Sequence, residues 1–378
     1  MTIRPRFKPC FLPVLLMLIG LAGCSTPDAD PAAVTVYHTG EGPYPVYRIP
    51  VAIATPEGHL LAFAEGRTAG LGDAGDIDVV LRRSEDGGTT WGPIQIVCDD
   101  GPHTCGNPAP VVDRRTGIIH LLMTRNLGTD REAAIITGTS EDVRRVWYTR
   151  SADGGRSWEA PRDISDQARR PEWRWYATGP VAGIQLEQAP HAGRLVIPAN
   201  HSTPVAERDP AAYRSHILFS DDGGATWQIG GVAAPFTNES TVAQLSDGRL
   251  MLNMRSYHGR HARAVATSSD AGVTWSDIRL DTVLVEPVCQ ASLLRLTRPD
   301  GGVLLFSNPA SRSRDSMTVR ASLDDGATWR TCRLVDAGMA AYSSLVAVDS
   351  ATVGLLYERD DYASIVFARL ELGSFIAP

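Results

Sequence analysis

Three arginines stand in short motifs that are spread over nearly the whole chain. Arg48 lies in Tyr-Arg-Ile-Pro, Arg255 closes Asn-Met-Arg, and Arg314 follows Ser-Asn-Pro. An arginine side chain can hold a planar anion with two parallel hydrogen bonds, so several arginines that converge could bind one carboxylate. Taken singly, each of these arginines is more typical of a surface ion pair. Their positions alone therefore assign no function.

Two acidic residues and a tyrosine stand in equally short motifs. Asp73 is the first of three aspartates in the glycine-flanked segment 72–78, and such a loop can carry a carboxylate out over a pocket. Capping of its own turn is the alternative role for Asp73. Glu239 lies in Asn-Glu-Ser-Thr, and Tyr342 lies in Ala-Tyr-Ser-Ser-Leu. A carboxyl group can move a proton, and a phenol becomes a nucleophile once a base removes its proton.

A repeated octet indicates which elements position these motifs. In a tight turn, Asp and hydroxyl side chains can bond nearby backbone groups, glycine permits a positive φ, and tryptophan anchors the next strand. Five equivalent turns cannot all line one site, so the repeat predicts structure and not catalysis. Each copy reads Ser-x-Asp-x-Gly-x-Thr/Ser-Trp, at 84–91, 151–158, 220–227, 268–275 and 322–329.

The rest of the chain predicts an all-β fold, because short alternating segments such as 60–64 and 249–254 outnumber helix signals. The octet resembles the Asp box, or BNR repeat, of sialidases and related β-propellers, where it joins the outer two strands of a blade. Successive copies begin 67, 69, 48 and 54 residues apart. This spacing fits one four-stranded blade per repeat, and about 355 mature residues at roughly 55–60 per blade predict six blades, one without a recognisable octet.

The motifs between the octets resemble, in the same order, those of the bacterial exo-alpha-sialidase (neuraminidase) family, over nearly the whole mature chain. The resemblance implies a six-bladed β-propeller that removes terminal alpha-linked sialic acid from glycoproteins, glycolipids and oligosaccharides, with retention of configuration and without a cofactor or metal. It implies that Arg48, Arg255 and Arg314 bind the substrate carboxylate. Arg312 and Arg320 lie close to Arg314, so this third match is open to a shift of register.

The resemblance also implies a division of the catalytic work. Asp73 matches the acid/base, Tyr342 matches the nucleophile, and Glu239 matches the base that removes the phenolic proton. Sialic acid carries a carboxylate on its anomeric carbon, which would repel an attacking carboxylate but not a neutral phenol. The remaining matches are Glu358 as the partner that orients Arg48, Arg67 as a contact of ring hydroxyls or the carboxylate, and Gln290 at the pocket rim.

The N-terminus predicts the compartment. Three basic residues precede a short apolar run, and Leu-Ala-Gly-Cys at 21–24 resembles a bacterial lipobox. We therefore expect residues 1–23 to be a lipoprotein signal peptide, 24–32 a tether that begins at lipidated Cys24, and 33–378 the propeller domain. An envelope lipoprotein of the outer membrane or periplasm, or one exposed at the surface, is implied. An ordinary signal peptide with a chance cysteine is the alternative.

Composition restricts the partners. The chain has 36 Lys and Arg against 43 Asp and Glu, a net charge of -7, which does not suit a coat on nucleic acid or an anionic membrane. We expect a monomer that binds sialylated glycans and contacts the membrane only through its lipid. His258 and His261 have no supporting cluster of ligands, so a metal site is not expected.

Four cysteines lie within the predicted domain. Cys98 and Cys105 are close in sequence, and an oxidising envelope would let them pair. Cys289 and Cys332 could form a second bridge or remain two free thiols. Their spacing does not decide between these alternatives.

Three other functions stay open on the sequence alone. A trans-sialidase, an anhydro-forming sialidase or a hydrolase that prefers the deaminated sugar KDN would share the catalytic set. A non-catalytic sialic-acid-binding lipoprotein would need only the arginines, so the joint presence of Asp73, Glu239 and Tyr342 favours an enzyme. An Asp-box protein with a structural role would need none of the ordered motifs.

Overall fold

The computed structural model describes residues 33–298 and 301–376. The predicted signal peptide, the lipidation site Cys24 and the tether lie outside these residues. Most regular structure within them is β-strand, which confirms the predicted all-β class, and no helix there has the length and apolar character needed to cross a membrane. The helical segments are α1 (Glu132–Thr137), α2 (Ser165–Ala168), η1 (Pro210–Ala212) and η2 (Leu372–Ser374).

The described strands pair as six antiparallel groups, of which four follow simple chain order. The first is β2 (Val46–Ala54), β3 (Leu60–Arg67), β4 (Ile77–Ser84) and β5 (Gln95–Cys98). The second is β6 (Thr104–Val112), β7 (Ile119–Asn126), β8 (Arg145–Ser151) and β9 (Arg162–Asp163). The third is β12 (Leu195–Ser202), β13 (Tyr213–Ser220) and β14 (Gln228–Val232), with β10 (Tyr176–Thr178) and β11 (Ile184–Gln185) together forming its inner edge. The fourth is β15 (Thr237–Gln244), β16 (Leu250–Ser256), β17 (Ala262–Ser268) and β18 (Arg279–Val285).

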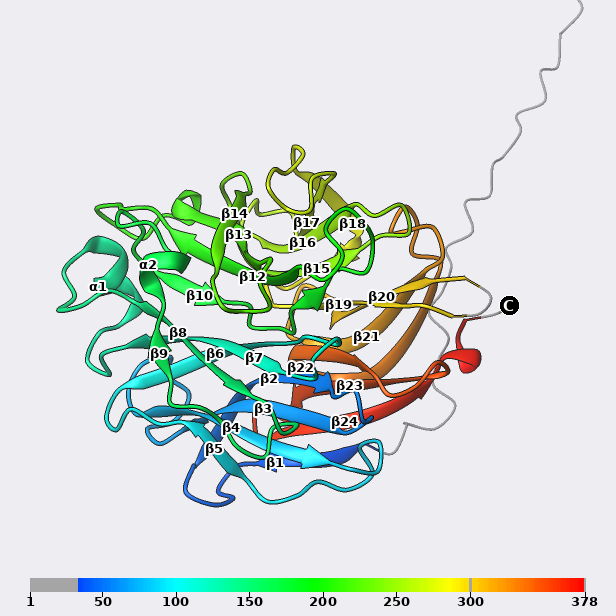
Figure 1. Ribbon diagram of the computed structural model, residues 1–378, viewed down its shortest axis with the longest axis horizontal. Coiled ribbons are helices and arrows are strands. Elements are labelled where there is room, and N and C mark those ends of the chain that lie inside the picture. The colour runs from blue at the N-terminus through cyan, green and yellow to red at the C-terminus, as the bar shows by residue number, and fades with distance from the viewer. Residues whose placement is uncertain (1–32, 299–300, 377–378) are drawn as a thin grey trace, which may run out of the picture.

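The last two groups share one long strand, β22 (Thr331–Ala347). Its first part pairs with β21 (Asp315–Ser322), which continues through β20 (Val303–Pro309) to β19 (Ser292–Leu296). Its second part pairs with β23 (Thr352–Arg359), which continues to β24 (Ser364–Glu371) and β1 (Val34–His38). The blue first strand and the red last strand therefore meet in one sheet (Figure 1).

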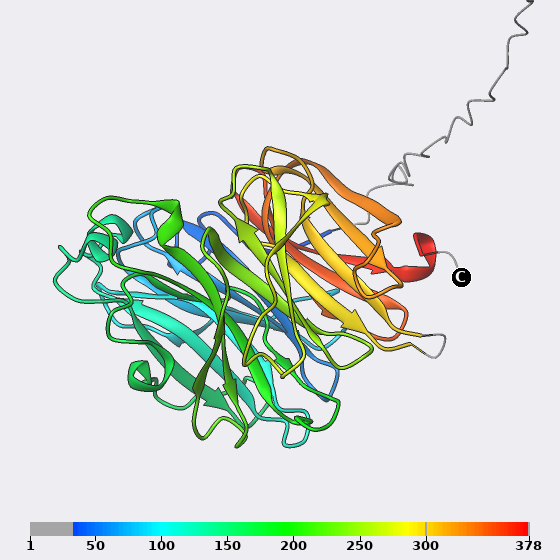
Figure 2. The same cartoon turned by 90° about the horizontal axis from the view of Figure 1, so that it is seen from above.

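The six groups close into a ring. Contacts join neighbouring blades in turn, from β2 to β6, from β6 to β10, β11 and β12, from β12 to β15, then to β19 and β22, and from β22 back to β2. These strands surround the middle of Figure 1, while β5, β14 and β18 lie further out, and the view from above shows strands that run obliquely across the molecule (Figure 2). This arrangement is that of a β-propeller whose blades are the six groups.

The hydrophobic core lies between neighbouring blades. One cluster joins Val51 and Phe63 of the first blade with Leu121 and Met123 of the second, and similar clusters fill the other five junctions. Because this packing fixes the blades against one another, the inner strands can present polar side chains at the mouth of the ring.

Each octet forms the turn between the third and fourth strands of a blade. In the first copy, the Ser84 hydroxyl donates to Asp86 and accepts from the Gly88 amide, both at 2.8 Å. The other copies repeat these bonds. Asp86 accepts from the side chain of Thr90, which is the largest cause that lowers the pKa of Asp86 to about 2. These aspartates stabilise turns, as the sequence predicts.

The topology of the chain explains why one blade lacks an octet. Its third and fourth strands, β24 and β1, come from opposite ends of the chain, so no turn joins them. This blade therefore lacks the repeat because the two ends of the chain pair in it and close the ring.

Buried histidine predicts a loss of stability in acid. His120 on β7 is fully buried with its Nδ1 2.8 Å from the Tyr148 hydroxyl, and burial lowers the pKa of His120 to about 4. Unfolded histidine titrates near 6.5, so stability is fully present above that pH and falls by about 1.4 kcal/mol per pH unit on the way down to the folded pKa. We expect His120→Gln to remove this part of the slope in urea unfolding measured across that range. An unchanged slope would assign the effect to other groups.

Candidate active site

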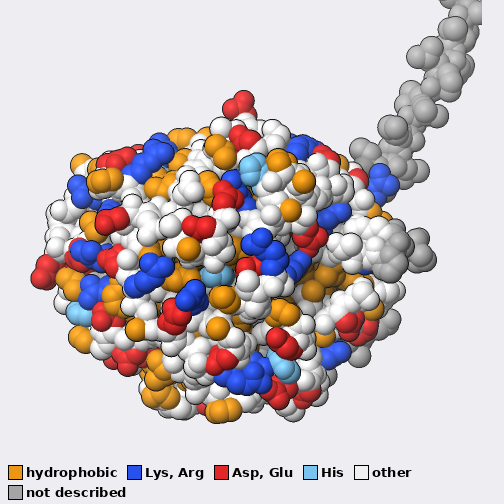
Figure 3. Space-filling model, viewed as in Figure 1, with side chains coloured by type: hydrophobic (Ala, Val, Ile, Leu, Met, Phe, Trp, Pro, Cys, Tyr) orange, Lys and Arg blue, Asp and Glu red, His pale blue; other side chains and the backbone are white. Residues whose placement is uncertain are grey.

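A polar cavity of about 190 Å³ opens at one mouth of the ring, and residues of all six blades line it. Arginines outnumber carboxylates in its wall, which suits an anionic ligand. On the face seen in Figure 3, acidic and basic side chains are mixed over the surface. The charged lining residues are Arg48, Glu65, Arg67, Asp73, Glu132, Arg144, Arg208, Glu239, Arg255 and Arg314.

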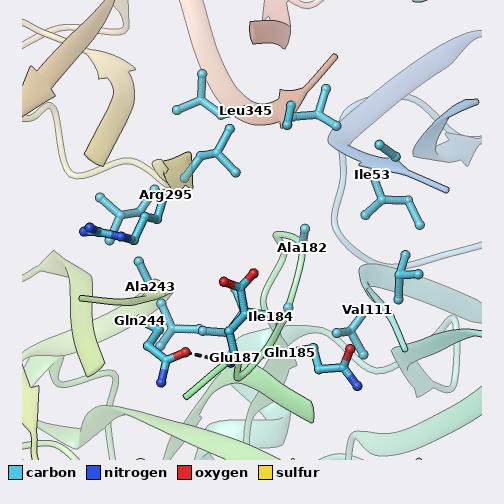
Figure 4. Close-up of a pocket in the computed structure, with 18 of the residues that line it drawn as sticks. Ile53, Val111, Ala182, Ile184, Gln185, Glu187, Ala243, Gln244, Arg295 and Leu345 are labelled. Atoms are coloured by element: carbon cyan, nitrogen blue, oxygen red, sulfur yellow. Dashed lines mark hydrogen bonds between the residues drawn. The ribbon is translucent and has the colours of Figure 1, made fainter. Parts of the chain in front are cut away.

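A larger cavity of about 440 Å³ lies at the opposite end of the inner strands. Figure 4 shows its wall, which includes Ile53, Val111 and Leu345, with Gln244 accepting from the Glu187 amide at 2.8 Å. The predicted catalytic residues are not part of this wall. Charge and hydrogen bonding, and not cavity size, therefore locate the candidate site.

The structure brings the predicted nucleophile and base into contact. The Tyr342 hydroxyl on β22 donates to Glu239 Oε1 on β15 at 2.5 Å. Arg255 Nη1 on β16 donates to Glu239 Oε2 at 2.8 Å and to the Tyr342 oxygen at 3.3 Å. Burial raises the pKa of Tyr342 well above its ordinary value, and the charge of Glu239 adds to the rise. The phenol is therefore neutral at rest and already bonded to a group that can take its proton.

Glu358 on β23 connects Arg48 to the tyrosine. Arg48 Nε donates to Glu358 Oε1 at 2.7 Å, and the fully buried carboxylate also accepts from the backbone amides of Ile49 at 2.9 Å and Tyr342 at 3.1 Å. The predicted pairing of Arg48 with Glu358 is therefore present. The same carboxylate also fixes the backbone of Tyr342, which the sequence did not indicate.

Bulges in the inner strands lie where those strands carry polar residues of the site. Regular pairing is interrupted between Arg48 and Val51 in β2, at 237–240 in β15 and at 340–343 in β22. Ile49 has a left-handed φ of 61° in the first of these bulges. A bulge turns a side chain away from the alternating direction of its strand, which allows these inner strands to aim Arg48 and Tyr342 into the cavity.

Asp73 lies in the loop between β3 and β4, with a side chain that is 70% exposed. Its Oδ1 is 2.9 Å from Arg67 Nη2. Arg67 is buried, donates to the carbonyls of Leu71 at 2.7 Å and Gly72 at 3.2 Å, and binds Glu65 Oε2 at 2.6 Å. Arg67 therefore organises the loop that presents Asp73 as well as lining the cavity.

The third arginine of the predicted set also reaches the cavity. Arg314 lies 5.6 Å from the centre of the Tyr342 ring, and its Nη1 donates to the Tyr362 hydroxyl at 2.8 Å. Arg312 is exposed, and Arg320 is outside the lining. This placement favours Arg314 over its two neighbours.

Gln290 is not at the rim, and that prediction is wrong. The residue is buried, its Nε2 donates to the carbonyls of Ser343 at 2.9 Å and Pro180 at 3.1 Å, and its Oε1 accepts from the Ser343 amide at 2.9 Å. The chain around Cys289 and Ala291 turns into the core. Gln290 therefore supports the strand that carries Tyr342 through hydrogen bonds to the neighbouring residue, Ser343.

The structure also bears on the two pairs of cysteines in the domain. Cys289 is a buried free thiol, so the possible bridge to Cys332 is not formed, and burial raises the pKa of Cys289 to about 11. Cys98 and Cys105 are also free thiols, with their sulfur atoms 2.7 Å apart. Their pairing in an oxidising compartment stays a prediction.

The sequence did not mark one side of the cavity. Arg144 is buried at 4.0 Å from the Trp175 ring centre, donates to Asn107 Oδ1 at 2.8 Å, and has its pKa lowered to about 10 by burial. Tyr257 and Glu132 also line the wall. In the sequence these three are isolated polar or aromatic residues outside any motif, which are too common to identify a site.

Comparison with known proteins agrees with this geometry. The BNR repeat-like domain family matches residues 58–355. A sialidase of Micromonospora viridifaciens is 36% identical over 334 residues, which are 84% of this chain and 50% of that protein. An exo-alpha-sialidase of Arthroderma benhamiae is 33% identical over 342 residues, which are 84% of this chain and 78% of that protein.

A solved structure shows the same fold. A Hadza microbial sialidase superposes with a TM-score of 0.82 at 34% identity, covering 91% of this chain and 69% of that one. The chain spans about half the length of the Micromonospora relative, so the match concerns only part of that protein. With the BNR repeats, the ordered motifs and these relatives in agreement, the chain belongs to the sialidase family.

Proposed function

We propose that the protein is a retaining exo-alpha-sialidase that hydrolyses terminal alpha-linked sialic acids on glycoproteins, glycolipids and oligosaccharides. The observation that carries the proposal is the hydrogen bond of 2.5 Å from Tyr342 to Glu239, in a cavity that arginines from separate blades line. A protein that only captured the sugar would need the arginines but not this buried phenol and carboxylate pair. Relatives named sialidase over most of the chain support the same reading.

The arginines bind the substrate's carboxylate in this proposal. Arg48, Arg255 and Arg314 come from the first, fourth and fifth blades and all line the cavity. Their guanidinium groups can offer forked donors to one planar anion. Glu358 limits the freedom of Arg48, and Glu239 does the same for Arg255. The anomeric carbon, which bears that carboxylate, is then brought to the Tyr342 oxygen.

The first step forms a covalent intermediate. The Tyr342 oxygen attacks the anomeric carbon while Glu239 takes the phenolic proton. The bond from the anomeric carbon to the leaving oxygen breaks, and Asp73 supplies that oxygen with a proton. Asp73 Oδ1 is paired with Arg67 in the free protein, and the carboxyl has to carry a proton before it can act as the acid.

The second step releases the sugar. Asp73 takes a proton from water, the water oxygen attacks the anomeric carbon, and the bond to Tyr342 breaks. Glu239 returns the proton to the phenolate, which restores the starting state. Two displacements at one carbon leave its configuration unchanged.

The effect on activity of removing the Asp73 carboxyl should depend on the leaving group. We expect Asp73→Ala to lower kcat/KM strongly for natural sialosides with alkoxide leaving groups and only slightly for activated aryl sialosides, which need little protonation. Rates for 3'-sialyllactose and for an aryl sialoside, measured on the same preparation, test this. Equal losses on both substrates would remove Asp73 from the acid role.

A fluorogenic sialoside assay tests the proposed function itself. We expect the purified protein to hydrolyse a 4-methylumbelliferyl sialoside without added metal, since side chains can fill every role. Among the residues that the structure covers, no cluster of three or more His, Cys, Asp or Glu is placed to hold a metal ion. Activity that vanished with EDTA and returned with zinc would contradict the proposal. Free sialic acid as the product separates a hydrolase from a transferase or an anhydro-forming enzyme.

We also propose that Cys24 carries a lipid that attaches the protein to the cell envelope. The lipobox-like sequence at 21–24 supports this. Cys24→Ala should move the protein from the membrane fraction to the soluble fraction while the sialoside activity stays. Continued attachment of the variant to membranes would count against the anchor.

A further inference from the structure

Tyr362, in the turn between β23 and β24, contacts two of the three arginines. The Arg48 guanidinium lies 4.1 Å from the centre of the Tyr362 ring, and Arg314 Nη1 donates to the Tyr362 hydroxyl at 2.8 Å. Tyr362 also packs against a buried group that contains Ile49 and Tyr342. Tyr362 is not one of the residues that line the cavity, so these contacts place it next to the arginines and outside the lining.

Resting on the proposed function, we propose that Tyr362 is a positioning residue that orients Arg314 and Arg48 toward the substrate's carboxylate. Its ring supports Arg48 through a cation–π contact, and its hydroxyl fixes the direction of Arg314. Nothing in the sequence motifs marks this residue, and the mechanism above does not use it.

Arg314 differs from the other two arginines because its partner, the Tyr362 hydroxyl, is neutral. Arg48 is ion-paired with Glu358 at 2.7 Å, and Arg255 is ion-paired with Glu239 at 2.8 Å. Within residues 33–298 and 301–376, no carboxylate lies within 4.0 Å of the Arg314 guanidinium. A phenol can hold the guanidinium in place without cancelling its charge. Among these three arginines, Arg314 therefore supplies the positive charge that no carboxylate partner compensates, and this charge attracts the substrate's anion.

The backbone of the turn agrees with a positioning role. Asp360, Asp361 and Tyr362 have left-handed φ angles of 54°, 51° and 67°. Residues with side chains avoid this region, and such strain persists only where the surroundings enforce it. The Ala363 amide donates to Asp360 at 2.9 Å, and the Thr39 amide donates to Ala363 at 2.8 Å, which fastens the turn to the chain that follows β1. The strained turn thus holds the ring of Tyr362 against Arg48.

A carboxylic acid and its neutral methyl ester, used as a pair of ligands, test the proposal. The probes are 2,3-didehydro-sialic acid and its methyl ester, with affinities measured by calorimetry on the full protein. We expect Tyr362→Phe to weaken the acid roughly tenfold and to leave the ester unchanged, because the variant loses only the bond that orients Arg314. In turnover, KM should rise more than kcat falls. Tyr148→Phe, which removes a hydroxyl bonded to His120 in the second blade, is the control and should change neither affinity.

A second variant tests the charge argument. Tyr362→Glu supplies an anionic partner and should weaken the acid more than Tyr362→Phe does, again with little effect on the ester. Equal losses for acid and ester, or no loss for the acid in either variant, would overturn the proposal. Wild-type protein that neither bound the acid nor cleaved a sialoside would instead contradict the proposed function, so the two failures are distinguishable.

Discussion

Replacement of Arg48, Arg255 or Arg314 by lysine is expected to lower kcat/KM by roughly 30- to 1000-fold, which is about 2–4 kcal/mol of transition-state binding. Lysine keeps the positive charge but loses the planar fork that can hold a carboxylate with two bonds. The effect should therefore appear for every substrate that carries the anomeric carboxylate, whatever its leaving group. Steady-state rates on the fluorogenic sialoside measure it.

Arg312→Lys is the matched control, because Arg312 lies two residues from Arg314 and is exposed. We expect a change in kcat/KM within about twofold for this variant, as for a surface substitution that alters no site contact. An essential Arg312 together with a dispensable Arg314 would show that the assignment in this segment is displaced by two positions.

Stability should separate two of the lysine variants, Arg48→Lys and Arg314→Lys. Arg48 and Glu358 form a buried pair, so Arg48→Lys leaves a buried carboxylate with a poorer partner and should lower the thermal midpoint. Arg314 has the Tyr362 hydroxyl as its bonding partner, so Arg314→Lys should lower activity with a smaller change in the midpoint. Equal midpoints for both variants would contradict this difference.

The features that could be predicted from the sequence depend on local chemistry. The octet at 84–91 forms the same turn wherever it occurs, because its Ser, Asp and Gly bond within eight residues. Five copies therefore indicate blades without knowledge of any long-range contact. The motifs around Arg48, Glu239 and Tyr342 predicted members of one cavity because their order along the chain resembles that of a family.

The features that could not be predicted depend on register and packing between blades. Gln290 resembled a rim residue, yet the segment before β19 that contains it is buried, and its side chain bonds the Ser343 backbone. Arg144 lies in the loop just before β8, and Tyr362 lies in the turn between β23 and β24, so their roles depend on the neighbours that closure of the ring supplies. The bulge between Arg48 and Val51 carries no sequence signature apart from the proline that follows Ile49.

Tyr342→Phe is expected to lower kcat by on the order of 10³-fold or more, because it removes the proposed nucleophile and leaves the binding arginines in place. A 3-fluoro sialyl fluoride can trap the intermediate in the wild-type protein. Fluorine at C3 slows steps that pass through oxocarbenium-like states, while fluoride still leaves readily. The protein mass should then rise by one fluorosialyl unit, and peptide mapping should place the label on Tyr342.

The position of the label and the product configuration decide this assignment together. The Tyr342→Phe variant should keep its fold and part of its ligand affinity but acquire no label, whereas Tyr362→Phe, which alters another tyrosine close to Arg48, should still be labelled. The first-formed product, followed by NMR before mutarotation, should be the α-anomer. Label on another residue, or a first product of inverted configuration, would contradict attack by Tyr342. Glu239, which is 2.5 Å from the phenolic oxygen, would then be the group to test as a base acting directly on water.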